Sequence, residues 1–139
     1  MAYLFDTNAI SEALRQRPNP DFMRWLQVLP REDQFTSTVV VAELYVAANR
    51  SAGRERWLRR IEEDILSTMT ILPFELECAR MYGRLRAQLL DAGTPIGDID
   101  TQIAATALYH RLIVVTANIR HFERVDGLQL YTFTPGKKS

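Results

Sequence analysis

The sequence has 139 residues, of which 47% are hydrophobic and 24% charged, a composition typical of a single globular domain. Lys plus Arg and Asp plus Glu each number 17, so the net charge is zero and does not favour a nucleic-acid, membrane or acidic partner over the whole surface. No apolar run reaches the roughly 18 residues of a membrane span and no basic leader precedes the first one, so we expect a cytoplasmic protein without a membrane partner.

Soft metal ligands are scarce. Cys78 is the only cysteine, which excludes an internal disulfide, and His110 and His121 are the only histidines. A dedicated zinc site is therefore not expected. A metal bound by oxygen ligands remains compatible with the sequence.

Short apolar runs alternate with helical patterns along the chain. The strands are expected over residues 3–5, 34–37, 70–72, 112–115 and 128–133, the last at a sheet edge. The helices are expected over residues 7–17, 21–29, 38–49, 54–68, 74–91 and 98–110. This alternation predicts an α/β fold, a three-layer α/β/α domain over residues 1–134 with a central, mostly parallel sheet of four to five strands. Residues 135–139 are expected to form a flexible C-terminal tail.

In such sheets ligands gather at the carboxyl ends of the strands, near the point where the strand order reverses. Asp6 directly follows the first expected strand and so is a candidate site residue. Aspartate is also a favoured helix N-cap, and capping of the helix that begins at Thr7 is an equally good interpretation of this residue.

Glu43 lies in an expected helix among apolar residues. Its neighbours three and four positions away are Val39, Val40, Val46 and Ala47. This pattern predicts that Glu43 lies on the buried face. A carboxylate there is costly unless it is paired or binds a metal, and Arg50, the nearest basic residue, is two turns away.

Asp100 has a similar setting in the first turn of its expected helix. Its neighbours on the same side are Ile96, Gly97, Ile103 and Ala104. Asp98 is two residues earlier and points elsewhere on a regular helix, so it is interpreted first as the N-cap and second as a contact to metal or water. Thr116 and Asn118 follow the fourth expected strand, where a turn is the alternative interpretation.

Three carboxylates brought together in a dry crevice repel one another. A divalent cation removes this repulsion, and ligands that are all oxygen favour Mg²⁺ or Mn²⁺ over zinc.

Several ordered segments carry a family resemblance. They are LFDTNAIS at 4–11, VAEL at 41–44, PIGDIDTQIAA at 95–105, VTAN at 115–118, HF at 121–122 and VDGL at 125–128. With these segments the sequence resembles PIN-domain ribonucleases of the VapC toxin type along nearly its whole length. The resemblance implies Asp6, Glu43 and Asp100 as core metal ligands. Asn118 occupies a position where many relatives carry a fourth acid, a loss that Asp98 could offset.

The resemblance further implies an Mg²⁺-dependent endoribonuclease that leaves a 5′-phosphate. In our hypothesis for the mechanism, Thr7 and Thr116 are candidates to position water or phosphate through their hydroxyls, and Asn8 is a candidate to order the acids. The resemblance also implies a toxin inhibited by a cognate, VapB-like antitoxin, a homodimer, and DNA binding by the antitoxin alone. Some apolar side chains exceed what one small core needs: Ile10, Leu14, Phe22, Trp25, Leu26, Leu29, Trp57 and Leu58. Core packing is their default interpretation, and the resemblance adds a dimer interface and an antitoxin groove.

The RNA substrate must be held by local positive charge, because the net charge is zero. Basic residues are densest at Arg50, Arg54, Arg56, Arg59 and Arg60, with a second group at Arg84 and Arg86. A solvated helix face with Glu55, Glu62 and Glu63 as partners is the alternative interpretation.

Two other functions are compatible with parts of the pattern. A non-catalytic PIN-like module that binds or regulates a partner would fit the missing fourth acid. Phosphatase-type and receiver-type domains also place an Asp after the first strand, but neither explains Glu43 on a valine-flanked helix.

Overall fold

Five parallel strands form the centre of the computed structural model, which describes residues 1–137. The strands are β1 (Tyr3–Phe5), β2 (Gln34–Ser37), β3 (Thr70–Leu72), β4 (Ile113–Thr116) and β5 (Leu130–Thr132). Their order in the sheet is β3-β2-β1-β4-β5, and every neighbouring pair is parallel. The predicted α/β class is confirmed, β5 is an edge strand as expected, and the sheet is parallel throughout.

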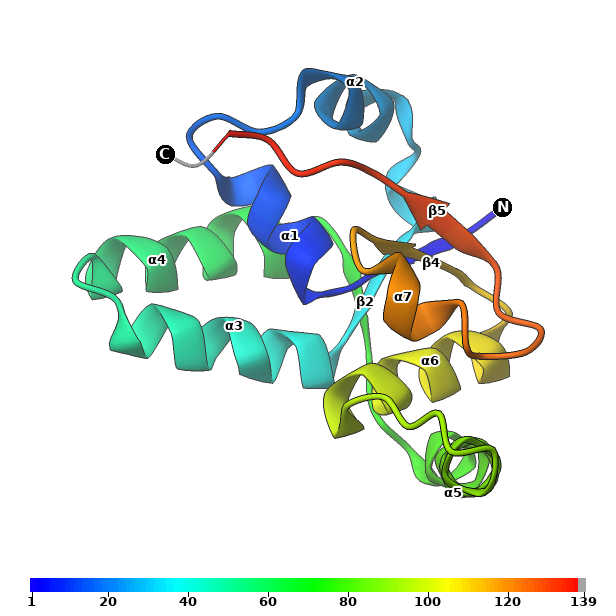
Figure 1. The fold of residues 1–139 in the computed structure, drawn as a ribbon. Coiled ribbons are helices and arrows are strands. Elements are labelled where there is room, and N and C mark those ends of the chain that lie inside the picture. The colour runs from blue at the N-terminus through cyan, green and yellow to red at the C-terminus, as the bar shows by residue number, and fades with distance from the viewer. Residues whose placement is uncertain (138–139) are drawn as a thin grey trace.

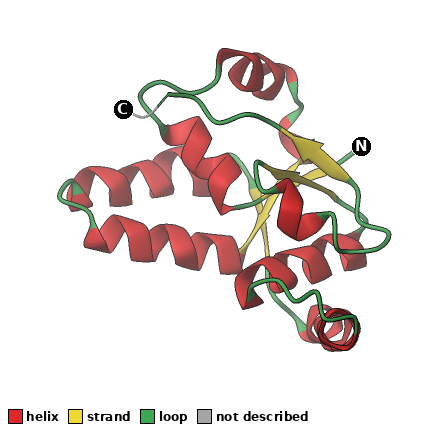
Figure 2. Cartoon of the chain, viewed as in Figure 1, coloured by secondary structure: helices red, strands yellow, loops and turns green. Residues whose placement is uncertain are grey.

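Helices connect the strands (Figure 2). They are α1 (Thr7–Leu14), α2 (Pro20–Val28), the 3₁₀ turn η1 (Arg31–Asp33), α3 (Thr38–Arg50), α4 (Arg54–Arg60), the π-helical η2 (Ile61–Leu66), α5 (Leu76–Asp91), α6 (Asp98–His110) and α7 (Ile119–Phe122). Figure 1 shows α1 and α2 on one side of the sheet and α5 and α6 on the other. From β1 the chain first adds β2 and β3 on one side of this strand and later β4 and β5 on its other side. Because crossovers between parallel strands are right-handed, the helices of these two halves cover opposite faces of the sheet.

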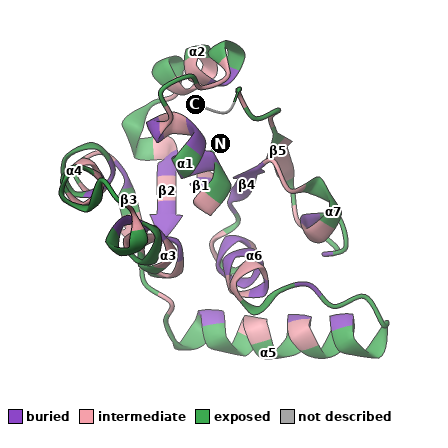
Figure 3. Ribbon diagram, turned by 60° about the vertical axis from the view of Figure 1, so that its left-hand side comes forward, coloured by how far each residue is buried: buried purple, intermediate pink, exposed green. Residues whose placement is uncertain are grey.

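The central strands are buried on both faces, because helices cover both sides. Leu4 and Phe5 of β1 and Val114 and Val115 of β4 have no exposed surface. Figure 3 shows much of α6 buried, whereas α5 turns a largely exposed side outward. Helix α6, which carries Asp100 in its first turn, is therefore held in place by its packing against the rest of the domain.

Some predicted boundaries were wrong. The first helix ends at Leu14 instead of residue 17, because the backbone of Arg15 is extended and the carboxylate of Glu12 accepts a hydrogen bond from the backbone N–H of Asn19, which closes the turn early. The segment expected to be one helix over 54–68 is α4 followed by the π-helical η2. The short helices η1 and α7 were not predicted, since three or four residues do not establish a helical period.

The chain near its C-terminus contacts the connection between α1 and α2. The backbone N–H of Gly136 donates to Glu12 Oε2 (2.8 Å), and the guanidinium of Arg15 donates to the carbonyl of Lys137 (3.2 Å). These bonds hold residues 136 and 137 of the expected tail against the domain, and residues 138–139 lie outside the described part. None of the helices within residues 1–137 has the length and apolar character of a membrane span.

Candidate metal-dependent active site

The strand order reverses between β1 and β4, and the polar residues that follow these two strands meet there. The backbone N–H of Asp6, just after β1, donates to the carbonyl of Val115 in β4 (3.2 Å). Asp6 is therefore fixed beside Thr116, the last residue of β4. Helices α1, α3, α6 and α7 surround this end of the strands (Figure 1), as expected for a ligand site in a doubly wound sheet.

Asp6 is buried, with 3% of its surface exposed. Its Oδ1 accepts a hydrogen bond from the backbone N–H of Ala9 (2.8 Å) as the N-cap of α1, so the capping interpretation is confirmed. Burial raises the pKa of Asp6 to about 6, despite hydrogen bonds from Thr116 and Ala9 that lower it, and the charge of Asp100 raises it further. Asp6 is therefore a helix cap and, at the same time, a buried carboxylate whose charge no basic group of residues 1–137 balances.

Glu43 lies in the second turn of α3 and accepts a hydrogen bond from the hydroxyl of Thr7. The prediction that Glu43 lies on the buried face of its helix was wrong, because Glu43 is half-buried and Val46 is 59% exposed. The buried stripe of α3 consists of Val40, Leu44 and Ala48. Glu43 is beside this stripe, and it is linked to Asp6 through the adjacent Thr7.

Asp100 lies in the first turn of α6 and is three-quarters buried at its side chain. Its Oδ2 is 2.8 Å from Nδ1 of His121 in α7, and the amide nitrogen of Asn118 is also 2.8 Å from this ring atom. Because a carboxylate can only accept, the tautomer that serves Asp100 carries the proton on Nδ1. The side-chain amide of Asn118 must then be oriented so that its oxygen, and not its nitrogen, faces Nδ1 of His121.

His121 was not predicted as a site residue, although the HF segment belongs to the resemblance. It joins Asp100 to Asn118, and it comes within reach because α7, which was also not predicted, folds back after β4. A histidine one helical turn after Asn118 is a weak signal in the sequence, since its partner Asp100 is 21 positions away.

Asp98 points toward α5. Its Oδ1 is 2.7 Å from the guanidinium of Arg86 and accepts from the hydroxyl of Tyr82 at 3.2 Å. The N-cap interpretation was wrong, because Gly97 is the N-cap of α6 and no side chain caps this helix. Asp98 is therefore engaged by Arg86 of α5.

Thr116 and Thr7 hold the acids. Thr116 is fully buried, hydrogen-bonds Asp6, and accepts the backbone N–H of Asn118 at 2.8 Å. It thus has the predicted turn role and a contact with the site. Thr7 opens α1 and holds Glu43.

Asp100 is thus close enough to Asp6 for their charges to interact, and Glu43 is linked to Asp6 through the adjacent Thr7. None of the three has a Lys or Arg within salt-bridge distance among residues 1–137. Within the same residues, their oxygens do not form a group lying within 4.8 Å of one another. A cation that binds all three must draw them closer together, and their donors are oxygens only, as Mg²⁺ prefers.

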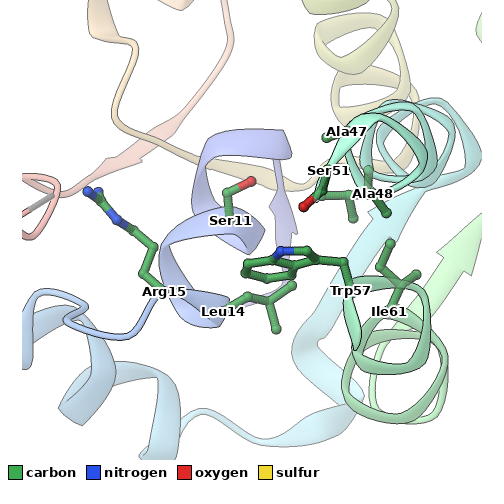
Figure 4. A pocket seen from close by; sticks show the side chains of 9 residues that line it. Ser11, Leu14, Arg15, Ala47, Ala48, Ser51, Trp57 and Ile61 are labelled. Atoms are coloured by element: carbon green, nitrogen blue, oxygen red, sulfur yellow. The ribbon is translucent and has the colours of Figure 1, made fainter. Parts of the chain in front are cut away.

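An apolar groove lies between α1, α3 and α4 (Figure 4). Its volume is about 310 Å³. It is lined by Ser11, Leu14, Arg15, Leu44, Ala47, Ala48, Ser51, Trp57 and Ile61. Of the apolar residues singled out in the sequence, Leu14 and Trp57 line the groove, whereas Ile10 and Phe22 are core residues with at most 2% exposure. Ser11 and Leu14, in the second turn of α1, therefore form part of the groove wall, and Asp6 caps the same helix.

Within residues 1–137, some basic residues are exposed and others pair with acids or with carbonyl groups. Arg54, Arg56 and Arg59 are exposed along α4. Arg60 bonds Asp64 and the carbonyl of Leu14, and Arg86 bonds Asp98. The exposed arginines lie on the helix that also contributes Trp57 to the groove.

Comparison with known proteins gives a consistent picture. The PIN domain family model matches residues 3–128. Ribonuclease VapC2 of Haemophilus influenzae is 37% identical over 93% of this chain and 96% of its own length. Toxin FitB of Neisseria gonorrhoeae is 38% identical over 88% of this chain and 92% of its own.

The fold is also found in solved structures. The crystal structure of VapBC2 from Rickettsia felis, bound to a DNA fragment from its promoter, superposes with a TM-score of 0.88. It is 30% identical and covers 96% of this chain and all of the matched chain. Other structures with the same fold are described as toxin–antitoxin complexes or systems.

Proposed function

The chain belongs to the PIN-domain family, and we propose that Asp6, Glu43 and Asp100 bind the divalent cation with which it cleaves RNA. It is a ribonuclease toxin of the VapC type, inhibited by an antitoxin. The observation that carries the metal proposal is the buried carboxylate of Asp6, next to Asp100 and without a basic partner within residues 1–137. Mg²⁺ is the expected ion and Mn²⁺ the alternative, because the donors are oxygens.

The residues around the acids have separate tasks in this proposal. The backbone N–H of Ala9 and the hydroxyl of Thr116 fix the carboxylate of Asp6. Thr7 orients Glu43, and its position at the N-terminus of α1 also suits contact with a water or a phosphate. Asn8 follows Thr7 and is assigned only a supporting role in ordering this turn.

On the other side, His121 orients Asp100 and Asn118. When bound, the cation supplies a water of lowered pKa and neutralises charge that develops on the phosphoryl oxygens. Asn118 is neutral where an acid would add charge, so one tightly bound cation is expected. Asp98 is assigned no ligand role, because Arg86 pairs with it. We expect endonucleolytic cleavage that leaves a 5′-phosphate.

Removal of divalent cations tests the proposed function. We expect cleavage of a mixed RNA pool in the presence of Mg²⁺, and a loss of at least about 100-fold in EDTA, because the phosphoryl charge then lacks its counter-charge. Mg²⁺ in excess over EDTA should restore the rate. Equal cleavage with Mg²⁺, with EDTA and after Asp6→Asn substitution would contradict the proposal and favour the non-catalytic partner-binding module.

Replacement of His121 tests how Asp100 is positioned. In the His121→Ala variant, Asp100 and Asn118 lose their shared partner, and we expect the apparent Mg²⁺ affinity to fall by about 10-fold to 100-fold. The measurement is the Mg²⁺ dependence of the cleavage rate. His110→Ala, at the far end of α6, is the matched control and should keep the Mg²⁺ dependence of the wild type. An unchanged Mg²⁺ dependence in His121→Ala would show that the ring has no part in the site.

We propose that an apolar segment of the antitoxin occupies the groove between α1, α3 and α4. In support, the groove is lined by Leu14, Trp57 and Ile61, and it adjoins the helix that begins at Asp6. An antitoxin bound there can reach the acids with a basic side chain. We further propose that the antitoxin carries the DNA-binding activity, and that the toxin acts in the cytoplasm as a homodimer.

A charge placed in the groove tests this partner site. Ala47 is exposed and lines the groove. We expect Ala47→Glu to weaken antitoxin binding by at least about 10-fold, since the carboxylate is desolvated against apolar side chains. Calorimetry with the cognate antitoxin measures the change. Leu90→Glu, at an exposed apolar position of α5, should bind as the wild type does, and equal binding by both variants would exclude the groove.

A further inference from the structure

Three side chains with metal-binding atoms meet at the opposite end of α6 from Asp100. They are Glu75, the N-cap residue of α5, Cys78 in the first turn of α5, and His110, the last residue of α6. One ligand atom from each lies within 4.8 Å of the other two. Asp100 and His110 are ten residues apart on one helix, which corresponds to about 15 Å. This cluster is therefore separate from the acids around Asp6.

The imidazole of His110 gives the cluster a second feature. Its Nε2 is buried at the atom level and has no hydrogen-bond partner within residues 1–137. The carboxylate oxygen of Glu75 is 3.8 Å from Nε2, which is too far for a hydrogen bond. Nε2 therefore carries an unused lone pair or an unused proton, and a carboxylate oxygen of Glu75 lies near it.

We propose that Glu75, Cys78 and His110 bind a transition-metal ion of the Zn²⁺ type. A thiolate, an imidazole and a carboxylate form a mixed donor set that suits Zn²⁺ and disfavours Mg²⁺. Zinc bonds of about 2.0 to 2.3 Å put ligand atoms about 3.3 to 3.8 Å apart, so the three groups need to move together by roughly an ångström. The half-exposed side chain of Glu75 provides both this freedom and an entry path.

The buried thiol and the helix end fit this assignment. Cys78 has no exposed surface, and it must lose its proton when the metal binds. The C-terminal end of α6 favours a cation at His110. A zinc site was not expected, because the one cysteine lies 32 positions before His110. The packing of α5 on α6 brings these two residues together. Three protein ligands leave a fourth position for water or a donor from a partner.

Cobalt binding tests the proposal on the full chain. The metal-free protein is titrated with Co²⁺ in excess Mg²⁺, which occupies the acidic site. We expect one equivalent to produce a thiolate-to-cobalt charge-transfer absorption that Zn²⁺ removes by displacement. Cys78→Ser should abolish this absorption, and Glu75→Gln and His110→Gln should each weaken Co²⁺ binding by at least about 10-fold.

Two control variants separate this site from its surroundings. Glu77→Gln removes a neighbouring acid of α5 that pairs with Arg80, and Asp6→Asn changes the acidic site. Both should keep the cobalt absorption, and its retention in Asp6→Asn distinguishes this proposal from the nuclease assignment. Absence of the absorption in the wild type, or unchanged affinity in Glu75→Gln and His110→Gln, would overturn the proposal.

A measurement on the wild type covers the case in which the variants do not fold. X-ray absorption of the protein loaded with one equivalent of Zn²⁺ should show one sulfur ligand at about 2.3 Å together with imidazole. A spectrum with oxygen and nitrogen ligands alone would exclude Cys78 and with it the site.

Discussion

The Asp6→Asn variant is expected to lose RNA cleavage by at least about 1,000-fold in saturating Mg²⁺, which corresponds to about 4 kcal/mol of transition-state stabilisation. Asparagine retains one oxygen and can still accept from the N–H of Ala9, so the N-cap of α1 is preserved. The substitution removes a negative charge that the proposed metal site requires. The rate of cleavage of an RNA pool at saturating Mg²⁺ measures this effect.

The same variant is expected to be more stable than the wild type when no metal is bound. The pKa of Asp6 is raised from 3.8 to about 6 in the folded chain, so the folded state holds this proton more tightly than the unfolded state. The wild type therefore loses stability as the pH rises from about 4 through 6, and the penalty is complete above that range. Two pKa units correspond to about 3 kcal/mol, which Asp6→Asn should regain at pH 7.

Urea unfolding in EDTA at pH 4 and pH 7 measures this difference. We expect the gain of Asp6→Asn over the wild type to be present at pH 7 and absent at pH 4. Mg²⁺ should stabilise the wild type and leave the variant unchanged. Asp21→Asn, at an exposed acid of α2 that pairs with Arg24, serves as the control. Near wild-type cleavage by Asp6→Asn would contradict the assignment of Asp6, whatever its stability.

The sequence predicts the fold well because the signals for the sheet are local. The run 112–115 and the segment 3–5 are apolar throughout, as buried parallel strands require, and both form the centre of the sheet. The end of α1 was placed too late, because the turn that follows this helix is closed by the carboxylate of Glu12. This carboxylate binds the backbone N–H groups of Asn19 and Gly136, which lie outside the helix. No periodic pattern contains that information.

For the candidate site, too, the sequence carries only the signals that are local. Asp6 is identified by its place after a strand, which is a local feature. The argument for Glu43 relied on apolar neighbours, and the structure shows that two of these, Val46 and Ala47, are exposed. The apolar residues of a helix can line a groove as well as a core, so apolar neighbours do not establish that a helix face is buried. His121 depends on a contact across 21 positions, which the sequence does not show.

Glu12 illustrates the limit of the sequence most clearly, and among the substitutions considered its replacement by alanine should destabilise the protein most. Its side chain is 1% exposed and accepts three hydrogen bonds. They come from the guanidinium of Arg15 (3.0 Å) and from the backbone N–H groups of Asn19 (2.7 Å) and Gly136 (2.8 Å). One carboxylate thus closes the turn between α1 and α2 and holds a segment 124 positions away.

We expect Glu12→Ala to lower the free energy of unfolding by about 3 kcal/mol, because it leaves buried donors and the guanidinium of Arg15 without their acceptor. Glu12→Gln, which keeps one acceptor oxygen, should cost roughly half as much. Urea unfolding at pH 7 measures both. Glu32→Ala, at an exposed acid of η1, should stay within about 0.5 kcal/mol of the wild type.

Gly136 provides an independent test of the same contact. A Cβ at this position would lie 2.3 Å from the carbonyl oxygen of Arg17 and 2.8 Å from the backbone nitrogen of Asn19, so Gly136→Ala must displace the segment from Glu12. In the Gly136→Ala background, Glu12→Ala should therefore cost measurably less than in the wild type, because one of its three bonds is already lost. Full additivity of the two substitutions would mean that Glu12 stabilises the turn between α1 and α2 without the help of residue 136.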